Sequence, residues 1–268
     1  YLESEGAGQG YAGMAAAWDD KFIPGLKRLA DAIHEEKAVA CFQLMHCGRV
    51  GGEGSGYCIG PSAVPQRLRI FWPVREMSKE DIKNCIKQHV EGTRRGLEAG
   101  FDIIEISGIV GYLLSNFISK YTNRRTDEYG GDIRGRMRIV VEMIQEVKKL
   151  CGDDYPLGIR LCAEELLDDV RGNTPEESME SYKIAEEAGV DYISVTAGWQ
   201  ESIVPVISRD VPQGSWLHLA KRAKENVKVP IQMAYRLFKP ELPNKAIGEG
   251  TLDMWEICLL YTSDAADE

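Results

Sequence analysis

Four side chains with useful chemistry lie at or just past the ends of apolar segments, where α/β enzymes gather their functional groups. They are Gln43 in AVACFQL, Tyr112 after FDIIEIS, Arg160 in PLGIRLC and Arg236 after KVPIQMA. An amide offers a donor and an acceptor, which suits the mixed polar edge of a heterocycle. A guanidinium inside an apolar strand needs an anionic or strongly polar partner. A phenol can protonate a carbanion, because the carbanion is the stronger base.

Three of these residues also have a structural interpretation. The Gln43 amide could bond the backbone of a neighbouring loop, and the spacing supports both roles equally. Arg160 could form a salt bridge inside the sheet, with Glu105 as the candidate partner. Tyr112 could cap the end of the sheet with its hydroxyl bonded to a loop. On the residues alone, the structural role is preferred for Arg160 and Tyr112.

Apolar periodicity places these residues in an alternation of strands and helices. Strict alternation predicts a parallel sheet with helical crossovers. No Gly-x-Gly-x-x-Gly turn follows a strand, so an incomplete (β/α)8 barrel fits better than a dinucleotide-binding sheet. The segment 45–77 is predicted to be a long functional loop. Helices are predicted near 22–36, 78–100, 136–150, 174–188, 215–225 and 240–248, and strands near 38–44, 101–107, 156–162, 190–196, 228–234 and 252–257.

Composition argues against several classes of protein. The formal charge of -10 disfavours nucleic acid and anionic membranes as partners. No apolar run is long enough to span a bilayer, so no membrane association is expected. The seven cysteines contain no CxxC pair, which predicts reduced thiols in a cytoplasm rather than disulfides or a metal site.

Two segments carry a resemblance to a known family. GYLLSNF and TNRRTDEYGGDIRGRMR resemble the old yellow enzyme family of FMN-dependent oxidoreductases, and more closely its 2,4-dienoyl-CoA reductase and bile-acid-operon branch. The likeness extends to Cys258 and implies a TIM barrel whose third to eighth strands are visible here. Residues 1–258 are then a partial FMN-binding domain with a gap in the barrel wall. The tail 259–268 is interpreted as non-native.

The resemblance implies a role for each of the four residues. It places Gln43 on the pyrimidine ring of FMN and Arg160 beside N1 and O2 of that ring. Arg236, together with the helix that begins near Pro240, becomes a candidate for binding the FMN phosphate. Tyr112 becomes the proton donor to carbon after hydride has arrived from flavin N5.

Other positions depart from the family pattern or belong to its loops. Ser107 and Val110 replace the histidine pair that many members use to hold a carbonyl oxygen, which argues against simple enone or nitroalkene reduction. Leu259 stands where the family has a phosphate-binding arginine. His46 and Arg49 match the family motif QLxHxGR and are interpreted first as loop structure.

A second departure concerns the proton supply. Dienoyl-CoA reductases carry a histidine after Gly-Trp, whereas this chain has Gln200 after Trp199. We assign Gln200 to the catalytic pair with Tyr112, although an amide cannot supply a proton at neutral pH. Glu201 or water would have to supply the proton in place of the histidine.

Substrate contacts are predicted for Ser107, Trp199, Arg124 and Arg125. Ser107 and Trp199 lie next to the proposed catalytic residues, and Arg124 and Arg125 offer charge for an acidic substrate group. A CoA-like anion could also be bound by the arginines of the long loop, which are Arg67, Arg69 and Arg75.

The sequence therefore predicts a flavin oxidoreductase of the NAD(P)H type that reduces an activated C=C bond in a small enoate or enoyl-CoA. Four alternatives or extensions stay open. The same flavin could oxidise N-methylated amines, or the fragment could be an inactive truncated barrel. A flavin-free lyase or aldolase is disfavoured, because no lysine stands at a strand end. A longer protein would add 4Fe-4S, FAD and NAD(P)H sites and could be a homo-oligomer.

Overall fold

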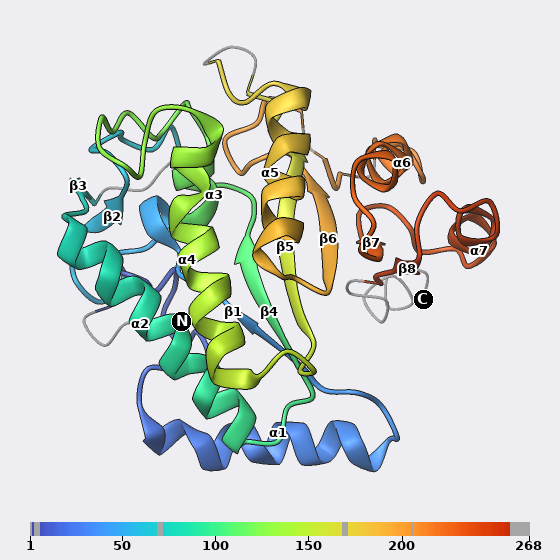
Figure 1. Ribbon diagram of the computed structural model, residues 1–268, viewed down its shortest axis with the longest axis horizontal. Coiled ribbons are helices and arrows are strands. Elements are labelled where there is room, and N and C mark those ends of the chain that lie inside the picture. Colours follow the sequence, from blue (N-terminus) through green and yellow to red (C-terminus); the bar gives the residue numbers. More distant parts are fainter. Residues whose placement is uncertain are drawn as a thin grey trace.

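The chain is built on one curved parallel β-sheet (Figure 1). The computed structural model describes residues 2, 6–68, 72–167, 171–204, 206–208 and 210–257. Neighbouring strands follow one another along the chain, the arrangement found in a barrel wall, and within the described ranges β1 and β8 form the two open edges. The order across the sheet is β1 (Cys41–Leu44), β4 (Ile103–Gly108), β5 (Leu157–Glu164), β6 (Tyr192–Ala197), β7 (Ile231–Met233) and β8 (Met254–Trp255).

Helices connect the strands and cover the convex face of the sheet. In Figure 1, α2, α4 and α5 lie side by side, with α2 next to the edge strand β1 and α5 against β5, while α6 and α7 flank β7 and β8. Ser78 and Thr174 begin α2 and α5 with capping boxes, which satisfy backbone N–H groups of the first turn. The helices are α1 (Ile23–Glu35), α2 (Lys79–Glu98), α3 (Leu113–Ile118), α4 (Ile133–Cys151), α5 (Pro175–Ala188), α6 (Leu217–Asn226) and α7 (Glu241–Gly248).

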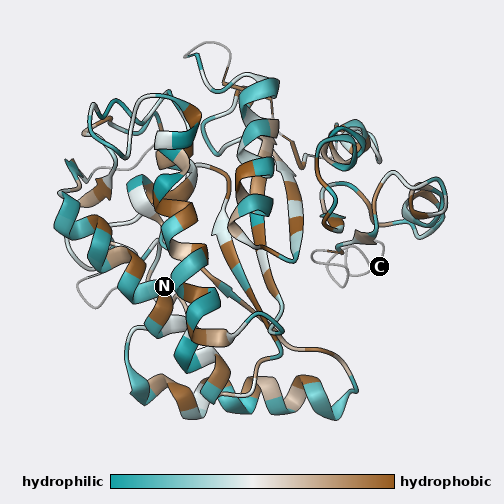
Figure 2. Cartoon of the chain, in the orientation of Figure 1, coloured by the Kyte–Doolittle hydropathy of each residue, from teal (hydrophilic) through white to brown (hydrophobic). Residues whose placement is uncertain are grey.

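The strands separate an apolar face from a polar one. Ile104, Ile159 and Ile193 are fully buried in the core formed with the helices. Because side chains alternate along a strand, the neighbours of these isoleucines in each strand point to the opposite, concave face. Figure 2 shows this as apolar bands along the strands and along α2, α4 and α5. The sheet thereby presents polar side chains on its concave side, including Glu105 and Arg160.

Several boundaries differ from the sequence prediction. The segment 45–77 contains a 3-10 helix (Gly48–Val50) and two short strands, β2 (Cys58–Gly60) and β3 (Val74–Glu76), which pair in parallel. The helix α3 was not predicted, because all its residues are buried and the segment lacks a polar face. Helix α4 begins earlier, where Asp132 accepts a hydrogen bond from the Gly135 N–H. A further 3-10 helix (Asp20–Phe22) precedes α1.

No helix in the described part of the chain is both long and apolar enough to cross a membrane.

Candidate active site

The lower layer of the concave face is a hydrogen-bonded group around Glu105. Gln43 Nε2 donates to Glu105 Oε1 at 2.6 Å, and the Tyr192 hydroxyl donates to Glu105 Oε2 at 2.9 Å. A Cβ on Gly158 would lie 2.0 Å from Tyr192 Cζ, so only glycine lets the phenol cross to β4. Burial raises the pKa of Glu105, and the bond from Gln43 opposes that shift. The amide is thus held by a buried carboxyl group and not by a loop backbone.

The next layer centres on Arg160. Its Nη2 lies 3.1 Å from Glu256 Oε2, and the Ser194 hydroxyl also bonds the Glu256 carboxylate. The salt bridge predicted for Arg160 therefore exists, but Glu105 was the wrong partner. Ser107 lies opposite Arg160 in the register of β4 and β5. Ser107 Oγ and Arg160 Nε are both buried without a hydrogen-bond partner among the described residues.

Tyr112 and Gln200 meet at the carboxyl end of β4. The backbone after β4 turns sharply, with Val110 at a φ of 48°, a conformation that β-branched residues rarely adopt. There Val110 pairs with Trp199, and the Gln200 N–H donates to the Val110 carbonyl at 3.2 Å. Burial raises the pKa of Tyr112, and a side-chain hydrogen bond from Gln200 opposes the shift. The paired backbone thus brings the two predicted catalytic residues to the same end of the sheet.

Trp199 is placed by the same turn. A Cβ on Gly111 would lie 3.0 Å from the Trp199 ring, so glycine leaves room for the indole. The ring is 4% exposed and packs in a cluster with Val64, Tyr121 and Leu167. Its Nε1 is buried without a partner among the described residues. Trp199 is thus a wall of the site with one unused donor.

Glu201 lies in a buried ion cluster beyond this wall. Its carboxylate pairs with Arg49 Nη2 at 3.1 Å and accepts from the Tyr121 hydroxyl at 3.2 Å. Arg67 Nη2 donates to its backbone carbonyl at 2.8 Å. Arg49, Arg67 and Tyr121 thus tie the Glu201 carboxylate into this cluster. Arg49 also donates to the Val64 and Pro65 carbonyls, which agrees with its interpretation as loop structure.

The predicted substrate arginines occupy different environments. Arg125 is 6% exposed at its side chain and pairs with Asp127 at 2.6 Å, while Nη1 donates to the Pro61 and Met77 carbonyls. These bonds make Arg125 a structural residue of its loop and correct its prediction as a substrate ligand. Arg124 is exposed at the rim of a cavity beside α5. Arg75 pairs with Asp81, and Arg69 lies outside the described residues.

Arg160 and Arg236 line one cavity of about 460 Å³ at the carboxyl ends of β5, β7 and β8. Tyr235 and Arg236 both have positive φ values, 68° and 57°, which re-aim the chain just after β7. Arg236 Nε donates to the Val211 carbonyl at 2.8 Å, and its guanidinium lies over the Phe238 ring. Helix α7 begins nearby at Glu241 without a side-chain cap.

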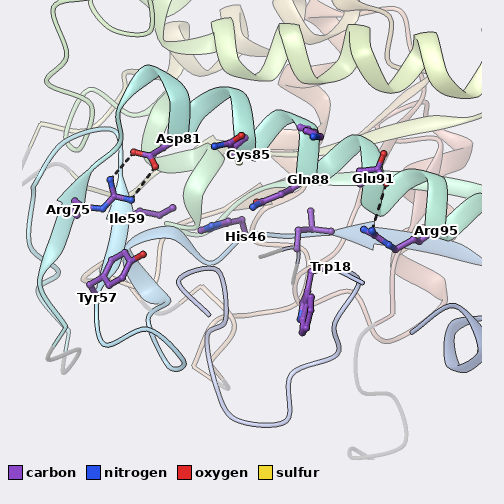
Figure 3. Close-up of a pocket in the computed structure, with 13 residues that line it drawn as sticks. Trp18, His46, Tyr57, Ile59, Arg75, Asp81, Cys85, Gln88, Glu91 and Arg95 are labelled. Carbon is purple, nitrogen blue, oxygen red and sulfur yellow. Dashed lines mark hydrogen bonds and ion pairs between the residues drawn. The ribbon is translucent and has the colours of Figure 1, made fainter. Parts of the chain in front are cut away.

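A second cavity of about 430 Å³ lies between α2 and the segments before and after β1 (Figure 3). Figure 3 shows the Arg75–Asp81 ion pair at one end and the Glu91–Arg95 pair at the other, with His46 between them. None of the predicted flavin or catalytic residues lines this cavity. It is therefore separate from the site on the concave face.

Comparison with known proteins identifies the family of the chain. Residues 1–254 match the sequence profile of the NADH:flavin oxidoreductase / NADH oxidase family. The chain belongs to this family. It is 37% identical over 243 residues to a metal reductase of Desulforamulus reducens, covering 90% of this chain and 36% of that protein. The chain thus spans about a third of the length of that relative.

Several solved structures are similar to this chain. A 2-naphthoyl-CoA reductase in complex with 2-naphthoyl-CoA has a TM-score of 0.90 and 38% identity, covering 94% of this chain and 40% of the other. Histamine dehydrogenase from Rhizobium sp. 4-9 has a TM-score of 0.79 and 30% identity, covering 89% and 35%. An old yellow enzyme homologue from Zymomonas mobilis shares the fold at a TM-score of 0.78 and 22% identity, covering 94% and 71%.

The concave face fits the FMN that this family binds. Arg160 Nε and Ser107 Oγ are buried polar atoms without a protein partner, which suits the polar edge of a flavin ring. The cavity beside Arg160 has a volume typical of cofactor sites. Gln43 and Arg160 would face the ring, and Arg236 the phosphate. Leu259 and Cys258 lie outside the described residues.

Sequence reasoning missed three residues of this face. Glu256 was included in a strand without a role, although a charged residue at a strand end is a usable signal. Tyr192 was counted only as part of an apolar strand. Tyr235 precedes Arg236 and lies near Arg160 and Glu256, where burial raises its pKa to about 12. Only the curvature of the sheet brings β8 residues next to β5.

Proposed function

We propose that this flavin oxidoreductase reduces an activated C=C bond, in a substrate of the enoyl-CoA kind, with Tyr112 as the proton donor. The observation that carries the proposal is the backbone pairing at the carboxyl end of β4, where Val110 pairs with Trp199 and the Gln200 N–H donates to the Val110 carbonyl, so that Tyr112 and Gln200 lie at the same end of the sheet. The strands that carry Gln43 and Arg160 lie on either side of β4. A phenol that stays protonated at neutral pH is suited to donate to a carbon centre. The similarity to an aryl-CoA reductase supports this choice of substrate.

Each protein group has a separate task in this reaction. Bound FMN supplies the hydride. Tyr112 gives its proton to the neighbouring carbon of the alkene. Burial raises the pKa of Tyr112 and the Gln200 amide opposes that rise, so the amide favours the phenolate that remains. Buried Trp199 keeps water from one side of the pair. Gln200 is thus a positioning residue, which explains how an amide can stand in the place of a histidine.

Amine oxidation is the second candidate. It is favoured by the 30% identity to histamine dehydrogenase. An amine substrate would not need a proton donor at Tyr112, because hydride leaves the substrate carbon and the resulting iminium hydrolyses. The two candidates therefore make opposite predictions for the tyrosine.

One assay separates them. The purified protein is tested for FMN released by heat, and its reduced form is then mixed with an enoyl-CoA while its oxidised form is mixed with an N-methylated amine. We expect reoxidation by the enoyl-CoA and no reduction by the amine. Reduction by the amine alone would replace the first candidate with the second, and absence of FMN would contradict both.

A further inference from the structure

Glu256 lies at the edge of the sheet formed by β8, yet its side chain contacts Arg160 of β5. Glu256 follows β8, whereas Arg160 belongs to β5, and β6 and β7 lie between these strands (Figure 1). Their side chains nevertheless approach to 3.1 Å, since the sheet curves and both point to its concave side. Both side chains are mostly buried, with exposed fractions of 18% for Arg160 and 17% for Glu256. The ion pair thus spans the floor of the cavity that also contains Arg236.

The carboxylate is fixed by a second bond. The Ser194 hydroxyl donates to Glu256 Oε1, while Arg160 pairs with Oε2, so each oxygen has its own partner. Ser194 also lies opposite Arg160 in the register of β5 and β6. Glu256 is therefore held in one position beside the guanidinium, whose Nε remains unpartnered among the described residues.

This arrangement changes what Arg160 can offer to a ligand. A guanidinium stabilises negative charge on a neighbouring ring, and a carboxylate at ion-pair distance offsets part of that effect. The offset matters most in a mostly buried site, where water screens the charges weakly. FMN gains negative charge on reduction, so the offset weakens binding of the reduced form more than of the oxidised form.

We propose that Glu256 is a positioning residue that restrains Arg160 and lowers the midpoint potential of the bound flavin. The proposal rests on the proposed function insofar as FMN occupies the concave face. It assigns a role to the residue just after β8, which pairs with Arg160 and sets how strongly the protein favours the reduced cofactor. A lower potential makes the reduced enzyme a stronger hydride donor.

The test compares the midpoint potential of the wild-type holoenzyme with that of its Glu256→Gln variant, both measured against reference dyes. The FMN affinity of each protein is measured separately, by the quenching of flavin fluorescence when the apoprotein is added. Glutamine keeps the size of the side chain and an acceptor for Ser194. We expect the variant to favour reduced over oxidised FMN at least tenfold more than the wild type does, a rise of ~30 mV for a two-electron couple. Glu256→Asp retains the charge at a greater distance and is expected to give a smaller rise.

Two controls isolate the ion pair. Glu249→Gln removes the same charge from an exposed position at the end of α7, where it pairs only loosely with Lys245, and should leave the potential unchanged. In an Arg160→Met background, Glu256→Gln should give a much smaller rise. An unchanged or lower potential in Glu256→Gln, or a full rise without Arg160, would overturn the inference. Failure of the wild type to bind FMN would instead contradict the proposed function itself.

Discussion

The side chains of Arg49 and Arg160 are both mostly buried, yet their surroundings differ. Arg49 is fully buried, bonds two loop carbonyls and Glu201, and has the Tyr121 ring beneath it. Arg160 has one charged partner, Glu256, and opens into a cavity. Among the described residues, a buried nitrogen lacks a hydrogen-bond partner in each side chain, Nη1 in Arg49 and Nε in Arg160, and Arg160 also lines a cavity. A buried cation thus marks a functional site when a cavity accompanies it.

The largest expected effect is a loss of kcat that distinguishes Tyr112, in the candidate active site, from Tyr121, in the cluster around Arg49 and Glu201. Tyr112→Phe should lower kcat for an enoyl-CoA about 10²–10⁴-fold, because the phenol donates the proton, while the FMN content stays unchanged. Tyr121→Phe makes the same chemical change beside Glu201 and should leave kcat nearly unchanged. Steady-state kinetics of both variants measure the difference. Equal losses in the two variants would remove Tyr112 from the mechanism.

The second prediction concerns the two arginines. Arg49→Met should lower the free energy of unfolding by about 3–5 kcal/mol, because it leaves the buried Glu201 carboxylate without its main partner. Arg160→Met should weaken FMN binding at least tenfold and cost less stability. Urea unfolding and flavin titration of both variants provide the two measurements. A reversal of the pattern would mean that Arg160, and not Arg49, supports the fold.

The smallest expected effect is a pH dependence of the free energy of unfolding that arises from Glu165, near the Glu201 cluster. Glu165 is buried after β5, where it accepts from Ser119 Oγ and the Asn173 N–H, and the Ser202 hydroxyl bonds its carbonyl. Burial raises its pKa from 4.5 to about 7, against the opposing bonds and Arg136, while Glu177 adds to the rise. Between pH 4.5 and about 7, Glu165 therefore stays protonated in the folded state while it is ionised in the unfolded state.

The sign of this effect follows from proton binding. The stabilising contribution is complete below pH 4.5 and is lost as the pH rises through about 7, with an upper limit of about 3 kcal/mol. Glu165→Gln resembles the protonated form and should remove this part of the slope. Unfolding free energies measured across that pH range for both proteins provide the comparison. An unchanged slope in the variant would assign the dependence to other groups.

Much of the fold was readable in the sequence because it depends on local patterns. The alternation of apolar strands and amphipathic helices predicted the parallel sheet, and Ser78 and Thr174 correctly predicted two helix starts. The short strands β2 and β3 were missed, because they pair only with each other across a loop. Helix α3 was missed because its residues are all buried and therefore lack a polar face.

The candidate site divides in the same way. The residue types of Gln43, Tyr112 and Arg160 and their positions at strand ends come from the sequence. Their partners do not, since Gln43 bonds Glu105, and Arg160 pairs with Glu256 across two intervening strands. Tyr112 is brought near Gln200 only by the backbone bond between Gln200 and Val110. Hydrophobic periodicity determines which face of a strand is buried, whereas the curvature of the packed sheet decides which distant side chains meet on the other face.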